Sequence, residues 1–185
     1  MSSAIVIAYH SGYGHTTQVA EAVAATSGAQ LLAIDAEGNL PEGGWNVLAA
    51  ARMIVFGSPT CMGMASWQFK KFAAASSKRW FGGLWKDKLS AGLTNSASIN
   101  GDKHSTLHCF MTLAMQQGMV WVGTGMMPAN SKAATGDDIN CLGSSAGLMT
   151  ATPSDASTDE RVAGDIATAK KFGERLVEAV VKFGG

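Results

Sequence analysis

Residues 4–17 read AIVIAYHSGYGHTT, a continuous apolar run that passes directly into a loop rich in glycine and hydroxyl groups. An apolar run without alternation is typical of a parallel strand that is covered on both faces. The loop after it ends in Thr16 and Thr17, two residues that can open a helix. A strand, a glycine-rich turn and a helix in this order predict the first unit of an α/β fold.

Four further segments share the apolar, β-rich character of the first run and predict strands at residues 30–35, 53–57, 89–95 and 119–123. Helices are predicted between them, one capped by Ser105 and the last opened by the capping box Ser157-Thr158-Asp159-Glu160. This alternation predicts a doubly wound, five-stranded parallel sheet with helices on both faces, a three-layer sandwich. Residues 127–156 show no sustained period, and we expect a long loop that lines the active site or an oligomer contact.

Length and composition limit the class of protein. The 185 residues are enough for one well-buried core, so we expect residues 1–185 to form a single domain. Fourteen basic and fourteen acidic residues leave no net charge to attract nucleic acid or a membrane surface, and no basic leader or long apolar segment is evident. A cytoplasmic protein is therefore expected. The three cysteines lack CxxC spacing, and His104 and His108 lack a third ligand, so no metal site is predicted.

The loop after the first strand has the composition of a phosphate site. In an open parallel sheet, ligands bind beyond the carboxyl ends of the strands. Gly12 and Gly14 expose backbone N–H groups, and the hydroxyls of Ser11, Thr16 and Thr17 lie at a helix N-terminus, so no Lys or Arg is needed. A tight turn with capping hydroxyls is the simpler interpretation, but alternating glycines favour phosphate binding.

A dinucleotide site is the competing interpretation, since Gly12-x-Gly14 is followed by Asp35 at the end of the second predicted strand. That pattern needs a third glycine near position 17, where the chain has Thr17. It also gives no role to residues 57–66 and 94–102, the loops after the third and fourth strands. Their main-chain polar groups and small side chains suit a flat, amphipathic ring, so a mononucleotide fits better.

The segments YHSGYGHT, GSPTCMG, residues 80–88 and QQGMVWVG, in this order and spacing, resemble the WrbA-type flavoproteins of the flavodoxin superfamily. The resemblance covers nearly the whole chain and is strongest before residue 125. It implies a flavodoxin-like fold, FMN as cofactor, and NAD(P)H:quinone oxidoreductase activity, in which NADH or NADPH passes a hydride to the flavin N5 and a quinone accepts the electrons. It also implies a homo-oligomer, dimer or tetramer, in which a neighbouring subunit completes each flavin site.

Carried onto this chain, the resemblance implies three sets of FMN contacts. The phosphate would contact Ser11, Gly12, Tyr13, Gly14, His15 and Thr16. The ring would contact Pro59, Thr60, Cys61, Met62 and Gly63 on one side and Asn95, Ser96, Ala97, Ser98, Ile99 and Asn100 on another. Tyr13 would also lie near the nicotinamide cofactor, and Trp80 either at the substrate pocket or in the core or a subunit contact. No catalytic acid or base is predicted, because the flavin carries the chemistry.

The chain departs from the family pattern at three places. Gln116 replaces a histidine, Cys61 and Met62 stand where a basic and an aromatic residue are common, and residues 99–102 replace a glycine run. Two other functions stay open: a flavodoxin-type one-electron carrier, and an FMN-binding protein without significant turnover. A carrier usually presents an acidic face for docking, whereas this chain is neutral overall.

Overall fold

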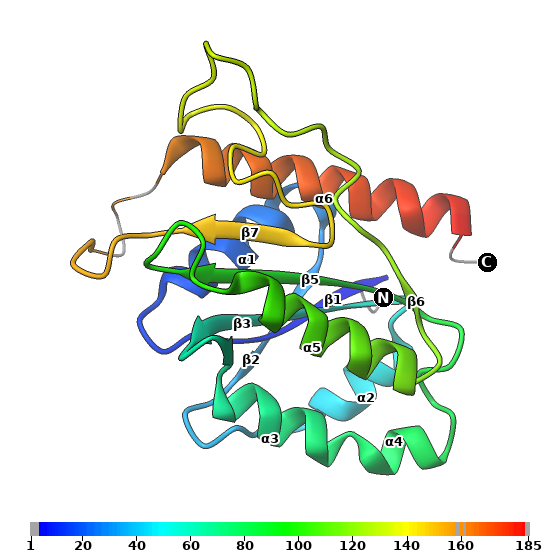
Figure 1. The fold of residues 1–185 in the computed structure, drawn as a ribbon. Helices are drawn as coiled ribbons and strands as arrows, with labels where there is room; N and C mark the ends of the chain where they lie inside the picture. Colours follow the sequence, from blue (N-terminus) through cyan, green and yellow to red (C-terminus); the bar gives the residue numbers. More distant parts are fainter. Residues whose placement is uncertain (1–3, 158–159, 161, 184–185) are drawn as a thin grey trace.

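The computed structural model describes residues 4–157, 160 and 162–183. In these residues a central sheet is covered by helices on both faces (Figure 1). The strands are β1 (Ile5–His10), β2 (Gln30–Ile34), β3 (Met53–Cys61), β4 (Met64–Ala65), β5 (Leu89–Ser96), β6 (Val120–Trp121) and β7 (Leu148–Ala151). The helices are α1 (His15–Ser27), α2 (Gly44–Ala50), α3 (Trp67–Ala75), α4 (Ser77–Phe81), α5 (Lys103–Gln116) and α6 (Ala163–Phe183).

The parallel strands follow the order β2-β1-β3-β5, with β6 and β7 both paired with β5 in the fifth position. This is the strand order of flavodoxin-like doubly wound folds. The short strand β4 turns back antiparallel onto the end of β3. The predicted fold class, a parallel sheet between two helical layers, is thus confirmed.

Strand β1 shows why the apolar run does not alternate. All six of its residues are buried. Ile5, Ile7 and Tyr9 belong to the core cluster on the face of α1 and α6, whereas Val6 and Ala8 belong to the cluster with α2, α3 and α5. Because successive side chains point to opposite faces and both faces are covered, the positions from Ile5 to Tyr9 are all apolar. His10, the last residue of the strand, is buried with its Nδ1 hydrogen-bonded to the Ile34 carbonyl over 3.0 Å.

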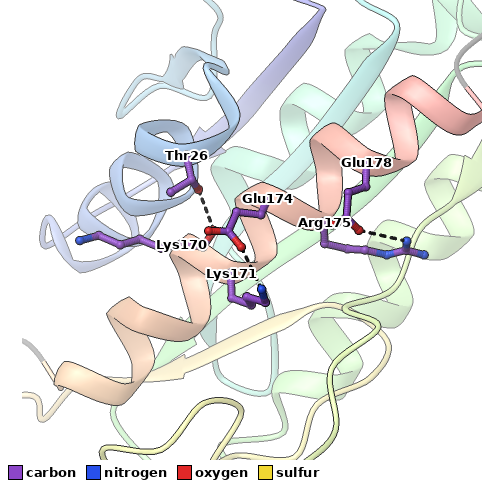
Figure 2. A network of polar contacts seen from close by, with 6 residues as sticks. All are labelled: Thr26, Lys170, Lys171, Glu174, Arg175 and Glu178. Atoms are coloured by element: carbon purple, nitrogen blue, oxygen red, sulfur yellow. Dashed lines mark hydrogen bonds and ion pairs between the residues drawn. The ribbon is translucent and has the colours of Figure 1, made fainter.

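Helices α1 and α6 pack closely on one face of the sheet. Gly173 of α6 lies against α1, where the carbonyl of Val23 and the hydroxyl of Thr26 leave no room for a Cβ atom. The Thr26 hydroxyl donates to the Lys170 carbonyl over 2.7 Å, so a hydrogen bond joins the two helices beside the glycine. Figure 2 shows the Thr26 side chain pointing from α1 toward α6. Ion pairs on the exposed side of α6, such as Lys171 with Glu174, lie within that helix.

The fifth strand position differs from the prediction. Of residues 119–123 only Val120 and Trp121 pair with β5, and the second half of β5 pairs with β7, inside the stretch predicted as a loop. β7 has four residues, of which Leu148 and Thr150 are buried, too few for a visible period. The segment between β6 and β7 runs beside α6, visible at the top of Figure 1, so this part of the stretch packs on a helix.

Two helix starts also differ from the prediction. α5 begins two residues before Ser105, after Asp102, whose φ of 52° turns the chain into the helix. α6 begins at Ala163, beyond the predicted capping box, although the Glu160 carboxylate does accept from the backbone N–H of Ser157 over 2.6 Å. The two middle residues of that box, Thr158 and Asp159, lie outside the described residues.

Candidate functional site

A cleft of about 350 Å³ lies at the carboxyl ends of β1, β3, β5 and β7. These strands are neighbours in the sheet, so the loops after them meet at the same edge. The cleft is lined by Ser11, Gly12, Tyr13, His15, Thr16, Pro59, Thr60, Cys61, Asn95, Ser96, Ala97, Thr152 and Ser154. The fold therefore brings the three loops that were singled out in the sequence to one place.

The first loop has the features that bind an anion through the backbone. Gly14 precedes α1 with φ 88°, a left-handed conformation that side chains other than glycine's resist. The Ser11 hydroxyl accepts from the backbone N–H of Thr17 over 3.3 Å, which fixes the loop to the first turn of the helix. His15 and Thr16 of that turn line the cleft, so the positive end of the helix adjoins it. Of the predicted phosphate residues, Gly14 alone does not line the cleft.

The second loop contributes its first half to the cleft. Pro59, Thr60 and Cys61 line it, and the Thr60 hydroxyl lies 2.8 Å from those of both Thr94 and Thr106, which holds the end of β3 against β5 and α5. Met62 and Gly63 form the turn between β3 and β4, with φ values of 49° and 76°. Met62 is fully exposed at that tip, so these two predicted residues lie outside the cleft of a single chain.

Only the first half of the third loop lines the cleft. Asn95, Ser96 and Ala97 line the cleft, whereas Ser98, Ile99 and Asn100 do not. The Asn95 side chain is fixed from the neighbouring strand, because its Oδ1 accepts from the hydroxyls of Thr150 (2.8 Å) and Thr152 (3.1 Å). With the oxygen occupied in this way, the amide NH2 is the group that Asn95 can offer to a ligand.

Sequence reasoning missed the fourth side of the cleft. Thr152 and Ser154 follow β7, the strand that was not predicted. The signal available was the short run LMTATPS, in which an apolar pair leads into hydroxyl residues, as at the ends of the predicted strands. His15 also contacts this segment, since its Nε2 donates to the Ala156 carbonyl over 3.1 Å.

Two buried charges lie behind the cleft, and neither was predicted. Lys103, at the start of α5, is fully buried, and desolvation lowers the pKa of its amine while the charge of Asp165 raises it. Asp165, in the first turn of α6, accepts from the backbone N–H of Ala151 over 2.7 Å. Burial raises the pKa of the Asp165 carboxyl, against the lowering by that hydrogen bond and by Lys103.

Trp80 lies apart from the cleft. It lines a second hollow of about 710 Å³, together with residues of α3 and α5 that include His104, His108 and Gln116. The Trp80 side chain is about half exposed, and Phe81 beside it is almost fully exposed. Within one chain, then, Trp80 and Gln116 share a surface that is separate from the cleft.

Among the described helices, none has the length and apolar character that a bilayer span requires.

Comparison with known proteins gives relatives of two kinds. No protein-family model matches the chain. Flavodoxin FldP of Pseudomonas aeruginosa is 49% identical over 176 residues, which are 95% of each chain. An NAD(P)H dehydrogenase (quinone) of Geotalea uraniireducens is 32% identical over 143 residues, 64% of this chain and 70% of that protein. Among solved structures, a WrbA-like flavodoxin from Agrobacterium tumefaciens superposes with a TM-score of 0.81 at 46% identity, covering 98% of this chain and 99% of its own.

Proposed function

From its membership of the WrbA-like branch of the flavodoxin-like flavoproteins, we propose that this chain is a single FMN-binding domain that oxidises NAD(P)H and reduces a quinone. The observation that carries the proposal is the convergence of the loops after β1, β3 and β5 on one cleft. A phosphate fits the first of these loops and a flat ring fits the other two. A cytoplasmic location remains part of this proposal.

The phosphate of FMN would sit at the start of α1. The backbone N–H groups of the turn from Gly12 to Gly14 and the hydroxyls of Ser11 and Thr16 supply donors there, and the helix end supplies partial positive charge. The lining holds no Lys or Arg among the residues that the structure describes. This site therefore binds the phosphate by directed hydrogen bonds, which fixes its position more tightly than a flexible ammonium group does.

The ring would lie between the loops of β3 and β5. Pro59 and Ala97 offer apolar contact, and Asn95 presents its amide to the ring edge. FMN, when bound, would supply the redox chemistry for a two-electron transfer from NAD(P)H to a quinone. The protein's part is to hold the ring, to exclude water from one face and to leave the other face open for both substrates.

A one-electron carrier is the second candidate, and one specific observation favours it. The relative that is 49% identical over 95% of each chain is named a flavodoxin, whereas the one named a quinone dehydrogenase is 32% identical. Against it stands the even balance of acidic and basic residues, since docking of a carrier is usually steered by net charge. A protein that binds FMN without significant turnover is the third candidate.

Anaerobic reduction distinguishes these functions. Excess NADH or NADPH is expected to bleach the flavin absorbance of the FMN-loaded protein without any partner reductase, and benzoquinone is expected to restore it. FAD offered in place of FMN serves as the control and is expected to bind poorly, because the loop at the start of α1 suits a terminal phosphate and not the bridged pyrophosphate of FAD. A flavin that stays oxidised with both nucleotides would indicate a carrier or an FMN-binding protein without significant turnover, and a protein that takes up no FMN would overturn the proposal.

The quaternary part of the proposal concerns Trp80. Because Trp80, Phe81 and Gln116 lie away from the cleft on a surface with exposed aromatic groups, we propose that they serve the site of a neighbouring copy in a dimer or tetramer. Exposed aromatic side chains beside a hollow are the usual anchors of such contacts. This arrangement gives Trp80 a place near a substrate pocket that its own chain does not provide.

Trp80→Ala is expected to weaken self-association by at least about tenfold, since a central aromatic anchor contributes about 2 kcal/mol or more. Analytical ultracentrifugation over a range of protein concentrations measures this change. Phe183→Ala is the matched control, because Phe183 is 58% exposed against 49% for Trp80 but lies on α6, on the other face of the sheet. Equal effects of the two substitutions, or none from Trp80→Ala, would contradict the proposed contact.

A further inference from the structure

Lys103 is a lysine without exposed surface, placed directly behind the candidate cofactor cleft. Its Nζ donates to the Ser96 hydroxyl (2.9 Å), the Ser98 carbonyl (2.7 Å) and the Ile99 carbonyl (2.8 Å). Three acceptors match the three donors of an ammonium group, and a neutral amine has only two. The hydrogen bonding therefore indicates a charged lysine held by neutral oxygen atoms.

These three bonds shape the loop after β5. Ser96 lines the cleft, and the loop from Ser96 to Ile99 curls around the Lys103 ammonium. The carbonyls of Ser98 and Ile99 are turned toward α5, so they are not available as acceptors for a ligand in the cleft. The positive charge thus lies one residue layer behind the wall that would contact the flavin ring.

Asp165 is a carboxylate whose charge acts on this lysine and raises its pKa. Its carboxylate holds the backbone N–H of Ala151, and Ala151 pairs with Ser96 across β7 and β5. The two groups influence each other's pKa, yet no ion pair within 4.0 Å joins them among the described residues. Lys103 and Asp165 therefore act on the cleft as two separate charges of opposite sign.

On the basis of the proposed function, we propose that Lys103 and Asp165 set the reduction potential of the bound FMN in opposite directions. Reduced FMN readily loses the proton at N1 and then carries an additional negative charge on its ring, which oxidised FMN does not. A fixed cation behind the ring stabilises the reduced form more than the oxidised form, and a fixed carboxylate does the reverse. Lys103 raises the potential, and Asp165 lowers it.

The test is a redox titration of FMN-loaded variants against indicator dyes. Lys103→Met is expected to weaken the binding of reduced FMN at least about tenfold more than that of oxidised FMN, which lowers the two-electron midpoint potential by about 30 mV. Asp165→Asn is expected to shift the potential upward. Opposite shifts identify electrostatic action, because loss of loop structure would weaken FMN binding in both variants without reversing the sign.

Lys88→Met is the matched control. Lys88 is a partly buried lysine whose pKa, like that of Lys103, is lowered by desolvation, and it donates to the carbonyls of Ala49 and Ala51 at the opposite end of β5. Lys88→Met is expected to lower the stability of the protein and to leave the reduction potential unchanged.

If Lys103→Met gives no folded protein, the shift in the potential of Asp165→Asn alone tests the inference. A wild-type protein that binds FMN while neither variant moves its potential would overturn this inference alone, whereas failure of the wild type to bind FMN would overturn the proposed function as well.

Discussion

Gly14→Val is expected to weaken the binding of FMN at least about 100-fold, which corresponds to about 2.8 kcal/mol. Gly14 has φ 88°, and a β-branched residue cannot keep that conformation without strain. Relief of the strain rotates the peptide groups between Ser11 and α1, so N–H groups that would face the phosphate turn away. A hydrogen bond to a charged group contributes about 1.5–3 kcal/mol, and the variant is expected to lose at least one.

Isothermal titration of the apoprotein with FMN measures the effect of Gly14→Val, and Gly28→Val provides its control. Gly28 caps the other end of the same helix with φ 65°, and an added Cβ atom there meets nothing within 4 Å. Its replacement introduces a similar backbone strain of about 1–2 kcal/mol, visible in the free energy of unfolding, and is expected to leave FMN affinity unchanged. Wild-type affinity in Gly14→Val would move the phosphate site away from this loop.

Four strands could be predicted from their own residues, without knowledge of the strands with which they pair. In β1, in β5 and in the first six residues of β3 nearly every residue is buried in the sheet, so composition alone indicates these strands. β2 lies at the end of the strand order with Leu32 and Ile34 buried, and its apolar residues also indicate a strand. β7 could not be predicted, because its four residues are too few to show a period and the residues of β5 with which they pair lie far away in the sequence. The strand predicted at residues 119–123 was too long for a related reason: β5 pairs with β6 along its first half and with β7 along its second half.

The residues of the candidate site also divide into those that the sequence could predict and those that it could not. Loops after predicted strands could be assigned to one edge of the sheet, which is why Ser11, Pro59 and Asn95 meet in the cleft. Thr152 depended on β7 and was missed with it. Lys103 gave no signal, because a lysine in the first turn of a helix is normally exposed, and its burial arises from the carbonyls of a loop that curls around it. Residue type and spacing do not predict such hydrogen bonds between a lysine and the carbonyls of a loop.

Gly173→Ala is expected to lower the free energy of unfolding by at least about 2 kcal/mol, although alanine is the better helix former by about 1 kcal/mol. An added Cβ atom would lie closer to the Val23 carbonyl and the Thr26 hydroxyl than real Cβ atoms come to any neighbour. The helices must then separate, which breaks the hydrogen bond from Thr26 to the Lys170 carbonyl. It also loosens the core under α1 and α6, which includes Leu176.

Urea denaturation of the apoprotein measures this loss, with Gly136→Ala as the control. Gly136 lies in the segment between β6 and β7, where an added Cβ atom meets nothing within 4 Å, so its replacement is expected to change stability by less than about 0.5 kcal/mol.

Combining Gly173→Ala with Thr26→Ala sharpens the test, because the second change removes a side-chain obstacle but leaves the Val23 carbonyl in place. The cost of Gly173→Ala should therefore be smaller in that background without disappearing. An undiminished cost would place the conflict with the α1 backbone alone, and no cost in either background would show that the two helices are not held at this separation.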